Sequence, residues 1–100
     1  MPMFRGTTPI NIFRTDVDLS HASVLFITYK QDGKVVLDKS IDEVKIQKHI
    51  VSVYLSQKDT LLFTEGIVTI QIRAKFPDGS AIASALIRTS TYEILKDGEI

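Results

Sequence analysis

The chain contains 100 residues, 44% of them hydrophobic, and its 12 basic and 12 acidic side chains leave no formal net charge. This length is typical of one domain, and the hydrophobic content argues against disorder. The sequence has no cysteine, which excludes a disulfide-stapled scaffold and a thiolate metal site. It also lacks the basic surplus of a nucleic-acid-binding protein.

The sequence contains no segment with the character of a membrane span. No apolar run approaches the roughly 20 residues that cross a bilayer. The start of the chain lacks the apolar region of a secretory signal. We therefore expect a soluble protein that is made in the cytoplasm and does not insert into a membrane.

The first segments predict an arm followed by an edge strand. Residues 1–8 include proline, glycine and two threonines, which favour an N-terminal arm. Residues 9–14 begin with proline, which suits the start of an edge strand. We expect Ile10 and Ile12 of this strand to face the core.

Residues 23–30 predict a second strand that is apolar on both faces. One face carries Leu25, Ile27 and Tyr29. Val24 and Phe26 lie on the other face, because successive side chains of a strand point in opposite directions. We therefore expect this strand to be covered on both sides.

Asp32 and Gly33 predict a hairpin turn after this strand. A primed turn needs positive φ angles, which glycine accepts without a steric cost. The partner strand is expected over residues 34–39, with Val35 and Leu37 facing inward.

The next segment predicts two further strands, over residues 42–48 and 50–55. Apolar and polar residues alternate in both, and Lys48-His49 fits a tight turn between them. Val44 and Ile46 are the apolar residues of the first strand, and in the second Val51, Val53 and Leu55 are expected to face inward.

Residues 56–63 interrupt the alternation and predict a crossing from one sheet to another. Ser56 can cap a short helical turn, and Asp59 follows it in a weakened form of the capping box. Phe63, with Leu61 or Leu62, is expected to close the end of the core.

Residues 66–90 predict the central hairpin of the fold. Five apolar side chains alternate with polar ones along its first strand: Val68, Ile70, Ile72, Ala74 and Phe76. Pro77 and Gly79 favour a turn, since proline presets φ and glycine accepts a positive φ. The return strand, residues 81–90, is rich in small residues, over which either a second sheet or a neighbouring subunit could pack.

These elements predict an all-β fold. About seven short strands separated by turn signals, with one short helical turn, are typical of an antiparallel two-sheet β-sandwich of the immunoglobulin-like kind. Two sheets packed face to face cover the apolar face that each sheet leaves open. We expect a single domain over residues 1–100, with a C-terminal tail over residues 96–100.

The run YLSQKDTLLFTEGIVTIQIRA resembles the E-to-F corner and F strand of immunoglobulin-like domains. In those domains an acidic residue closes the short turn before an alternating strand, and Asp59 corresponds to it here. The cysteines and core tryptophan of immunoglobulin domains are absent. The resemblance therefore concerns the shape of the corner.

The chain also resembles small phage and prophage tail-region proteins, which are similar to the N-terminal sandwich of phage upper-baseplate proteins. The matching segments are Asp18-Leu19-Ser20, Leu55-Ser56-Gln57, Asp59-Thr60, Gly66, Gln71-Ile72-Arg73, Asp78-Gly79 and Ile94-Leu95-Lys96-Asp97-Gly98. This resemblance implies a virion protein of the tail or baseplate, present in several copies. It implies neither catalytic residues nor a cofactor.

Candidate site residues belong to interaction surfaces and not to a catalytic centre. Gln71, Arg73 and Lys75 form a polar stripe on the outer face of the central strand, and arginine is favoured at interfaces. Phe4, Phe13, Phe26 and Ile82 are candidates for exposed apolar contacts. His21 and His49 both fall in predicted turns without a further ligand, so no metal site is expected.

The sequence therefore favours a phage virion structural protein, which assembles with itself and with other phage structural proteins. The alternative is an immunoglobulin-like binding module that recognises a carbohydrate or a protein. An enzyme is not expected, because no motif arranges a nucleophile, base or metal.

Overall fold

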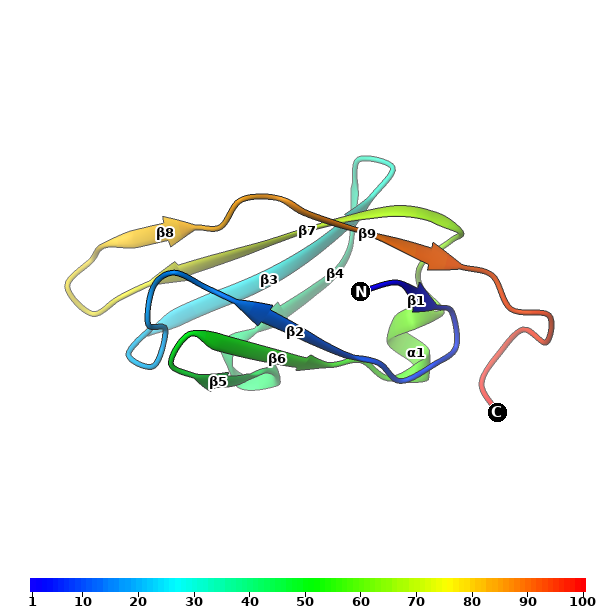
Figure 1. Cartoon of the computed structure of the whole chain (residues 1–100), viewed down its shortest axis with the longest axis horizontal. Coiled ribbons are helices and arrows are strands. Elements are labelled where there is room, and N and C mark those ends of the chain that lie inside the picture. Colours follow the sequence, from blue (N-terminus) through cyan, green and yellow to red (C-terminus); the bar gives the residue numbers. More distant parts are fainter.

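The computed structural model describes residues 1–100 and contains two β-sheets packed face to face (Figure 1). The larger sheet has the order β1-β9-β7-β3-β4, with β8 also paired to β7, and the smaller sheet has the order β2-β6-β5. The larger sheet contains β1 (Met3–Phe4), β3 (Val24–Gln31), β4 (Lys34–Ser40), β7 (Gly66–Lys75), β8 (Ala81–Ala83) and β9 (Ile87–Tyr92). The smaller sheet contains β2 (Ile10–Arg14), β5 (Lys45–Gln47) and β6 (Ile50–Tyr54).

The predicted all-β sandwich is confirmed, but its details differ. There are nine strands instead of about seven. The pairing of β1 with β9 is parallel, so the larger sheet is mixed. Besides the helical turn α1 (Gln57–Thr60), a 3₁₀ turn covers Ile41–Glu43, where the start of a strand was predicted. No helix of the chain has the length and hydropathy of a membrane span.

Strand β7 lies at the centre of the larger sheet, as its alternating sequence predicted. Its inward side chains Val68, Ile70, Ile72 and Ala74 are buried, and they pack with the buried Leu25, Ile27 and Tyr29 of β3. The turn after β7 also forms as expected: Gly79 has a φ of 90°, and the Phe76 amide donates to the Ser80 carbonyl at 2.9 Å.

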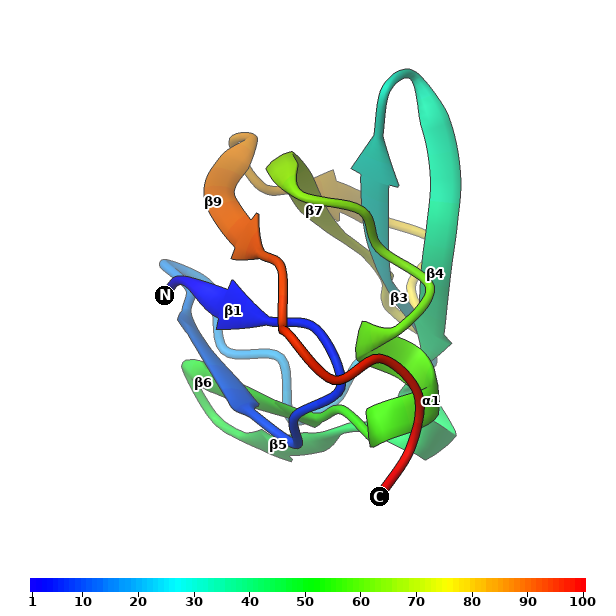
Figure 2. The ribbon, with the colours of Figure 1, turned by 90° about the vertical axis from the view of Figure 1, so that its right-hand side faces the viewer.

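The outer face of β3 is not covered, contrary to the prediction. Val24 and Phe26 are exposed, because the fold has only two layers and the smaller sheet packs on the inner face (Figure 2). These two apolar side chains therefore lie at the surface and do not form a second core.

The predicted turn at Asp32 and Gly33 forms, with φ angles of 53° and 76°. The predicted inward position of Val35 is wrong, since Val35 is exposed while Leu37 packs against the core. The register between β3 and β4 shifts after Tyr29. This irregularity places an extra residue in β4 and reverses the faces of the strand beyond it.

The predicted faces of β2 are also wrong. Ile12 is 56% exposed and Ile10 is similarly exposed, whereas Phe13 is 3% exposed and Asn11 is buried. The pairing with β6 explains the reversal, because Asn11 and Phe13 stand opposite Val53 and Val51, whose side chains face inward as predicted. Opposed residues of an antiparallel pair share a face.

The buried amide of Asn11 is only partly satisfied. Its Nδ2 lies 3.4 Å from the Met3 Sδ, and its Oδ1 has no hydrogen-bond partner. The hydroxyl of the fully buried Tyr29 also lacks a partner. Burial, with a smaller contribution from the charge of Asp59, raises the pKa of Tyr29 above its usual range, so this phenol stays neutral.

The crossing from the smaller to the larger sheet follows the prediction. Ser56 caps α1, with its Oγ accepting from the Asp59 amide at 3.0 Å while the Asp59 carboxylate accepts from the Ser56 amide at 3.0 Å. Phe63 is fully buried, whereas Leu62 is exposed. The Lys39 Nζ of β4 lies 3.0 Å from the Asp59 Oδ2, and this ion pair links the larger sheet to the crossing.

The predicted N-terminal arm is part of the sheet instead of a free segment. Met3 is buried and β1 pairs with β9. Arg5 then donates from Nε to the Phe63 carbonyl at 2.6 Å and forms ion pairs with Glu93 and Asp97. The arm is therefore attached to both the helical crossing and the C-terminal segment.

Substitutions in β2 test its reversed faces. Phe13→Ala is expected to lower the free energy of unfolding by about 3–5 kcal/mol, because it empties a filled core position. Ile12→Ser is expected to change it by no more than about 0.5 kcal/mol, because the side chain lies at the surface. Urea denaturation at micromolar protein concentration measures both, and a larger loss for Ile12→Ser would contradict this register.

The pKa of Asp59 predicts that the stability of the protein depends on pH. Burial raises its pKa, but hydrogen bonds from Ser56 and Lys39 outweigh that effect, so the pKa is lowered in the folded state. The ionised Asp59 therefore stabilises the folded state above the unfolded-state pKa of about 3.9. This stabilisation is lost as the pH falls through the folded-state pKa. Asp59→Asn should destabilise the protein at pH 7, and the difference from wild type should shrink below about pH 4.

Guanidinium denaturation between neutral and acidic pH measures this difference. The carboxylates of Glu43 and Asp78, whose pKa values are also lowered, remain in the variant. Glu43 shares Lys39 with Asp59, so the difference reports the Asp59 carboxylate together with its effect on Glu43. A difference that does not change with pH would contradict the role assigned to this carboxylate.

Candidate interaction site

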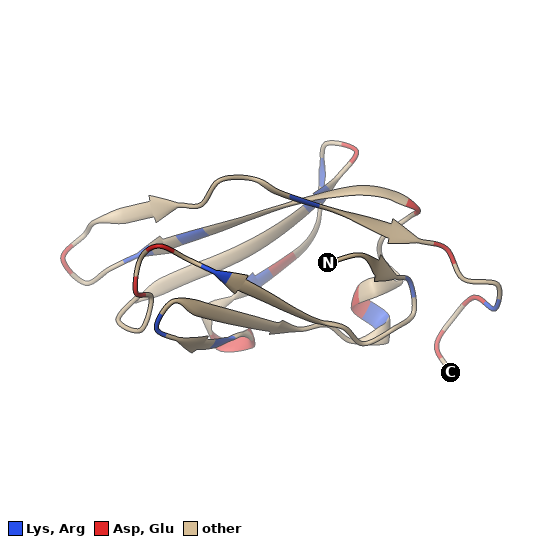
Figure 3. Ribbon diagram, in the orientation of Figure 1, with Lys and Arg blue, Asp and Glu red and all other residues tan.

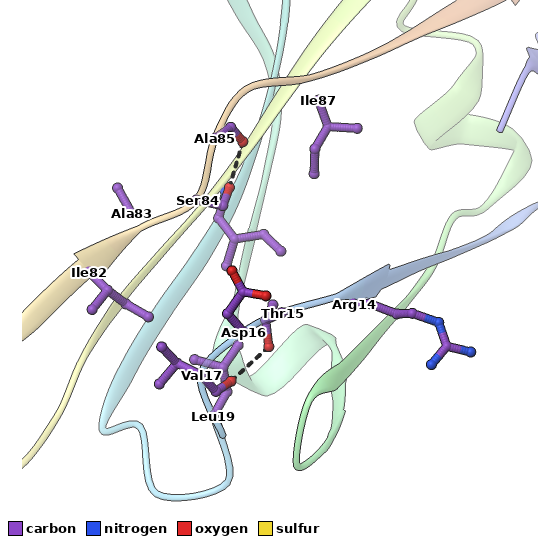
Figure 4. A pocket seen from close by; sticks show the side chains of 11 residues that line it. Arg14, Thr15, Asp16, Val17, Leu19, Ile82, Ala83, Ser84, Ala85 and Ile87 are labelled. Atoms are coloured by element: carbon purple, nitrogen blue, oxygen red, sulfur yellow. Dashed lines mark hydrogen bonds between the residues drawn. The ribbon is translucent and has the colours of Figure 1, made fainter.

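An apolar cleft of about 410 Å³ opens on one side of the sandwich (Figure 4). One wall comes from the segment after β2, and the other comes from β8 and the connection to β9. Its hydrophobic lining residues are Val17, Leu19, Ile72, Ile82, Ala83, Ala85 and Ile87. Asp16 contributes a charged group at the β2 side, whereas the side chain of Arg14 points away from the cleft (Figure 4).

The cleft exists because the return strand of the central hairpin is broken in two. Arg73 pairs with Ala83, whereas Ile70 pairs with Ile87, so one extra residue lies between β8 and β9. Ser84 occupies this irregularity: its amide donates to the Ile72 carbonyl at 2.8 Å, and its Oγ accepts from the Ile72 amide at 3.0 Å. The chain after Ser84 leaves the sheet, and the continuous return strand predicted for residues 81–90 is corrected accordingly.

The small residues of this segment are not covered by the second sheet. Ala81, Ala83 and Ala85 are exposed, and Leu86 beside them is exposed as well. The first of the two packing alternatives is therefore wrong for these alanines. Contact with a neighbouring subunit stays a prediction.

The predicted apolar contact residues lie in different environments. Phe13 is buried in the core, so its predicted exposure is wrong. Ile82 is half-buried and lines the cleft. Phe4 is exposed and packs against Tyr92, with 5.3 Å between the ring centroids. Phe26 is exposed on the outer face of β3, as predicted, and the structure does not bring the four residues together.

The three residues of the predicted polar stripe on β7 make different contacts. The Gln71 Nε2 donates to the Ser84 carbonyl at 2.9 Å, so this side chain supports the irregularity beside the cleft. Arg73 and Lys75 are exposed and stand opposite Phe26 and Val24 of β3. Together they line a shallow depression of about 310 Å³ on the outer face of the larger sheet.

The charged residues do not form a field of one sign. Figure 3 shows basic and acidic residues distributed over both sheets and the connecting loops. Arg73 and Lys75 share their depression with Asp38 of the neighbouring β4. The surface therefore combines small apolar areas with both signs of charge, a composition that does not distinguish an interface from the rest of a protein surface.

No group of three or more His, Asp and Glu residues is arranged to hold a metal ion. The His49 Nδ1 lies 3.0 Å from the Thr15 carbonyl at the turn between β5 and β6. Asp18 accepts hydrogen bonds from the Ser20 hydroxyl and amide, which lower the pKa of its carboxyl. These contacts stabilise turns.

Comparisons with known proteins provide little further information. No family model matches the chain, and no curated protein matches it. Among solved structures, the chain is similar to the V domain of amphioxus IgVJ-C2, with 14% identity over 92% of this chain and 99% of that chain, and a TM-score of 0.38. A likeness this distant carries no argument about function.

Sequence reasoning missed the cleft and found the outer apolar face only in part. It named Phe26 as a candidate exposed contact, which the structure confirms, but it also expected a second layer over Val24 and Phe26, which the structure lacks. The cleft had only an indirect signal, in the serine and alanines of residues 81–85. A one-residue register shift has no sequence signature of its own at such positions.

Ser84→Ala tests the origin of the cleft. The variant leaves the Ile72 amide without its acceptor, so the free energy of unfolding should fall by about 1–3 kcal/mol. Hydrogen exchange of the Ile72 amide should accelerate. Ser52→Ala, on the outer face of β6, is the matched control and should change neither quantity. Unchanged exchange at Ile72 would contradict the role of Ser84.

Proposed function

We propose that this chain is a structural subunit of a phage tail or baseplate, which acts by multi-copy assembly through protein–protein contacts. The observation that carries the proposal is the open apolar cleft next to β2, a strand with one open edge. Such a surface leaves both hydrophobic side chains and backbone groups available to another protein chain. The resemblance of the sequence to phage tail-region proteins supplies the biological setting.

The strand order supports an immunoglobulin-like arrangement, which forms part of the proposal. In immunoglobulin sandwiches, strands A, B, E and D form one sheet and C, F and G form the other. Here β2-β6-β5 correspond to B-E-D, and β9-β7-β3 correspond to G-F-C. Strand β4 extends the second sheet in the manner of the variable type.

The composition of phage particles tests this function. Particles produced by the host that carries the gene would be purified, treated with nuclease and high salt, and analysed by quantitative mass spectrometry. We expect the chain to remain with the particle in several copies, because assembly contacts bury apolar surface that salt does not screen. Its absence from intact particles would contradict the proposal.

A binding module is the second candidate, and one observation favours it. The exposed Phe4 and Tyr92 stack side by side on the β1–β9 edge of the larger sheet. Adjacent aromatic rings at a surface can serve as an apolar platform for a sugar or a side chain. A glycan-array screen distinguishes the two functions. The binding module would be favoured if the chain bound a glycan, if Phe4→Ala abolished that binding, and if the chain were absent from phage particles.

A further inference from the structure

We propose that the free edge of β2 pairs with β2 of a second copy of this chain, antiparallel and across a two-fold axis at Ile12. The two smaller sheets, each of three strands, would then form one continuous sheet. This inference rests on the proposed assembly function and names one of its contacts.

The first argument is that β2 has an open edge. It pairs only with β6, and the Leu55 amide donates to the Pro9 carbonyl at 3.0 Å at one end of this pairing. At the other end the Thr15 amide donates to the His49 carbonyl at 2.8 Å. Backbone groups alternate in direction along an antiparallel strand, so those of Ile10, Ile12 and Arg14 point to the open edge.

The strand order also indicates that the position beside β2 in the smaller sheet is unoccupied. In the immunoglobulin sheet A-B-E-D, strand A lies beside strand B, and β2 holds the position of B. The N-terminal strand β1 pairs with β9 in the opposite sheet, so no strand of this chain occupies the place of A. A strand from another molecule can fill it by β-augmentation.

The second argument is that β2 lacks the protection found on the edge strands β4 and β5. Charged side chains and irregular pairing normally prevent edge-to-edge contact. Strand β4 has Lys34, Asp38 and Lys39 together with a register shift, and the three-residue β5 has Lys45. The first four residues of β2 carry no charge, and Ile10 and Ile12 are exposed beside it.

The third argument identifies a second copy as the occupant. When the axis passes through Ile12, all five residues of β2 are paired: Ile12 faces its equivalent, and Ile10 faces Arg14 of the second copy. No like charges oppose each other. A register that set Arg14 against its equivalent would oppose two positive charges and pair only the end of the strand.

The outer face of the extended sheet adds complementarity. Tyr54 stands opposite Ile10 on β6 and is exposed. Arg14 of the second copy would lie on the far side of Ile10, on the same face. Its long side chain could reach across Ile10 towards the ring of Tyr54, a contact favourable for a guanidinium. The chain as a whole carries no net charge that would oppose association.

Disulfide cross-linking tests the axis directly, since the chain has no native cysteine. Directly opposed Cα atoms of a hydrogen-bonded pair lie about 5.5 Å apart, within the range of a disulfide. Ile12→Cys is expected to give a covalent dimer on oxidation. Ile10→Cys and Arg14→Cys should cross-link when mixed but not alone.

Val35→Cys is the matched control for these variants, because Val35 is 55% exposed on the protected edge strand β4. It should stay monomeric on oxidation. Equal cross-linking of Val35→Cys and Ile12→Cys, or none of Ile12→Cys, would overturn the inference.

Sedimentation of charge variants provides the second measurement. Ile12→Lys and Ile12→Glu should each weaken dimerisation at least about tenfold, since like charges meet at the axis. Their equimolar mixture should dimerise again, whereas Val35→Lys should behave as wild type. Circular dichroism verifies that each variant is folded. Dimerisation of Ile12→Lys equal to wild type would overturn this contact.

A strictly monomeric wild-type chain would also overturn this contact. The composition of phage particles would still test the proposed function separately. Absence of the chain from particles would contradict that function even if the dimer formed in solution.

Discussion

The antiparallel pairing of β7 with β3 is the contact on which the rest of the structure depends. It runs from Val24 opposite Lys75 to Lys30 opposite Thr69, and both strands place their inward side chains in one buried cluster. The smaller sheet packs on this cluster through Val51, Val53 and Phe13. Because a strand exposes alternate residues on opposite faces, the pairing determines which side chains must be covered.

A sandwich of this size has two layers and therefore two outer faces that nothing in the chain covers. This explains why exposed apolar residues occur on both sheets, with Phe26 on the larger sheet and Ile12 and Tyr54 on the smaller one. Single exposed hydrophobic residues are common on protein surfaces. Ile12 lies on β2, which has an open edge, and Phe26 lines the depression on the larger sheet.

The polar groups inside the sandwich are mostly tied to the segment that crosses between the sheets. The buried Gln31 accepts from the Thr64 amide at 2.8 Å and donates to the Thr64 carbonyl at 2.7 Å. Lys39 and Arg5 reach the same region from β4 and from the arm. These contacts connect the crossing to β4 and to the N-terminal arm, whereas beside the cleft the hydrogen bonds of Ser84 with Ile72 and Gln71 support the break in the return strand.

The sequence by itself determined the all-β class, the central hairpin, the turns at Asp32-Gly33 and Lys48-His49, and the cap of α1. Most of these follow from local chemistry: alternation over many residues, a positive φ at glycine, or a side chain that bonds to a neighbouring backbone group. The turn at Lys48-His49 follows from the break between two alternating segments, and Lys48 has a φ of 55° there. The sequence also identified Arg73 and Lys75 as exposed side chains. Only the tertiary structure decided which face of β2 is buried, where β4 shifts register, and where the return strand breaks to open the cleft. In those places the sequence is apolar on both faces or carries only small residues, so pairing with a distant strand selects between faces that local chemistry leaves equivalent.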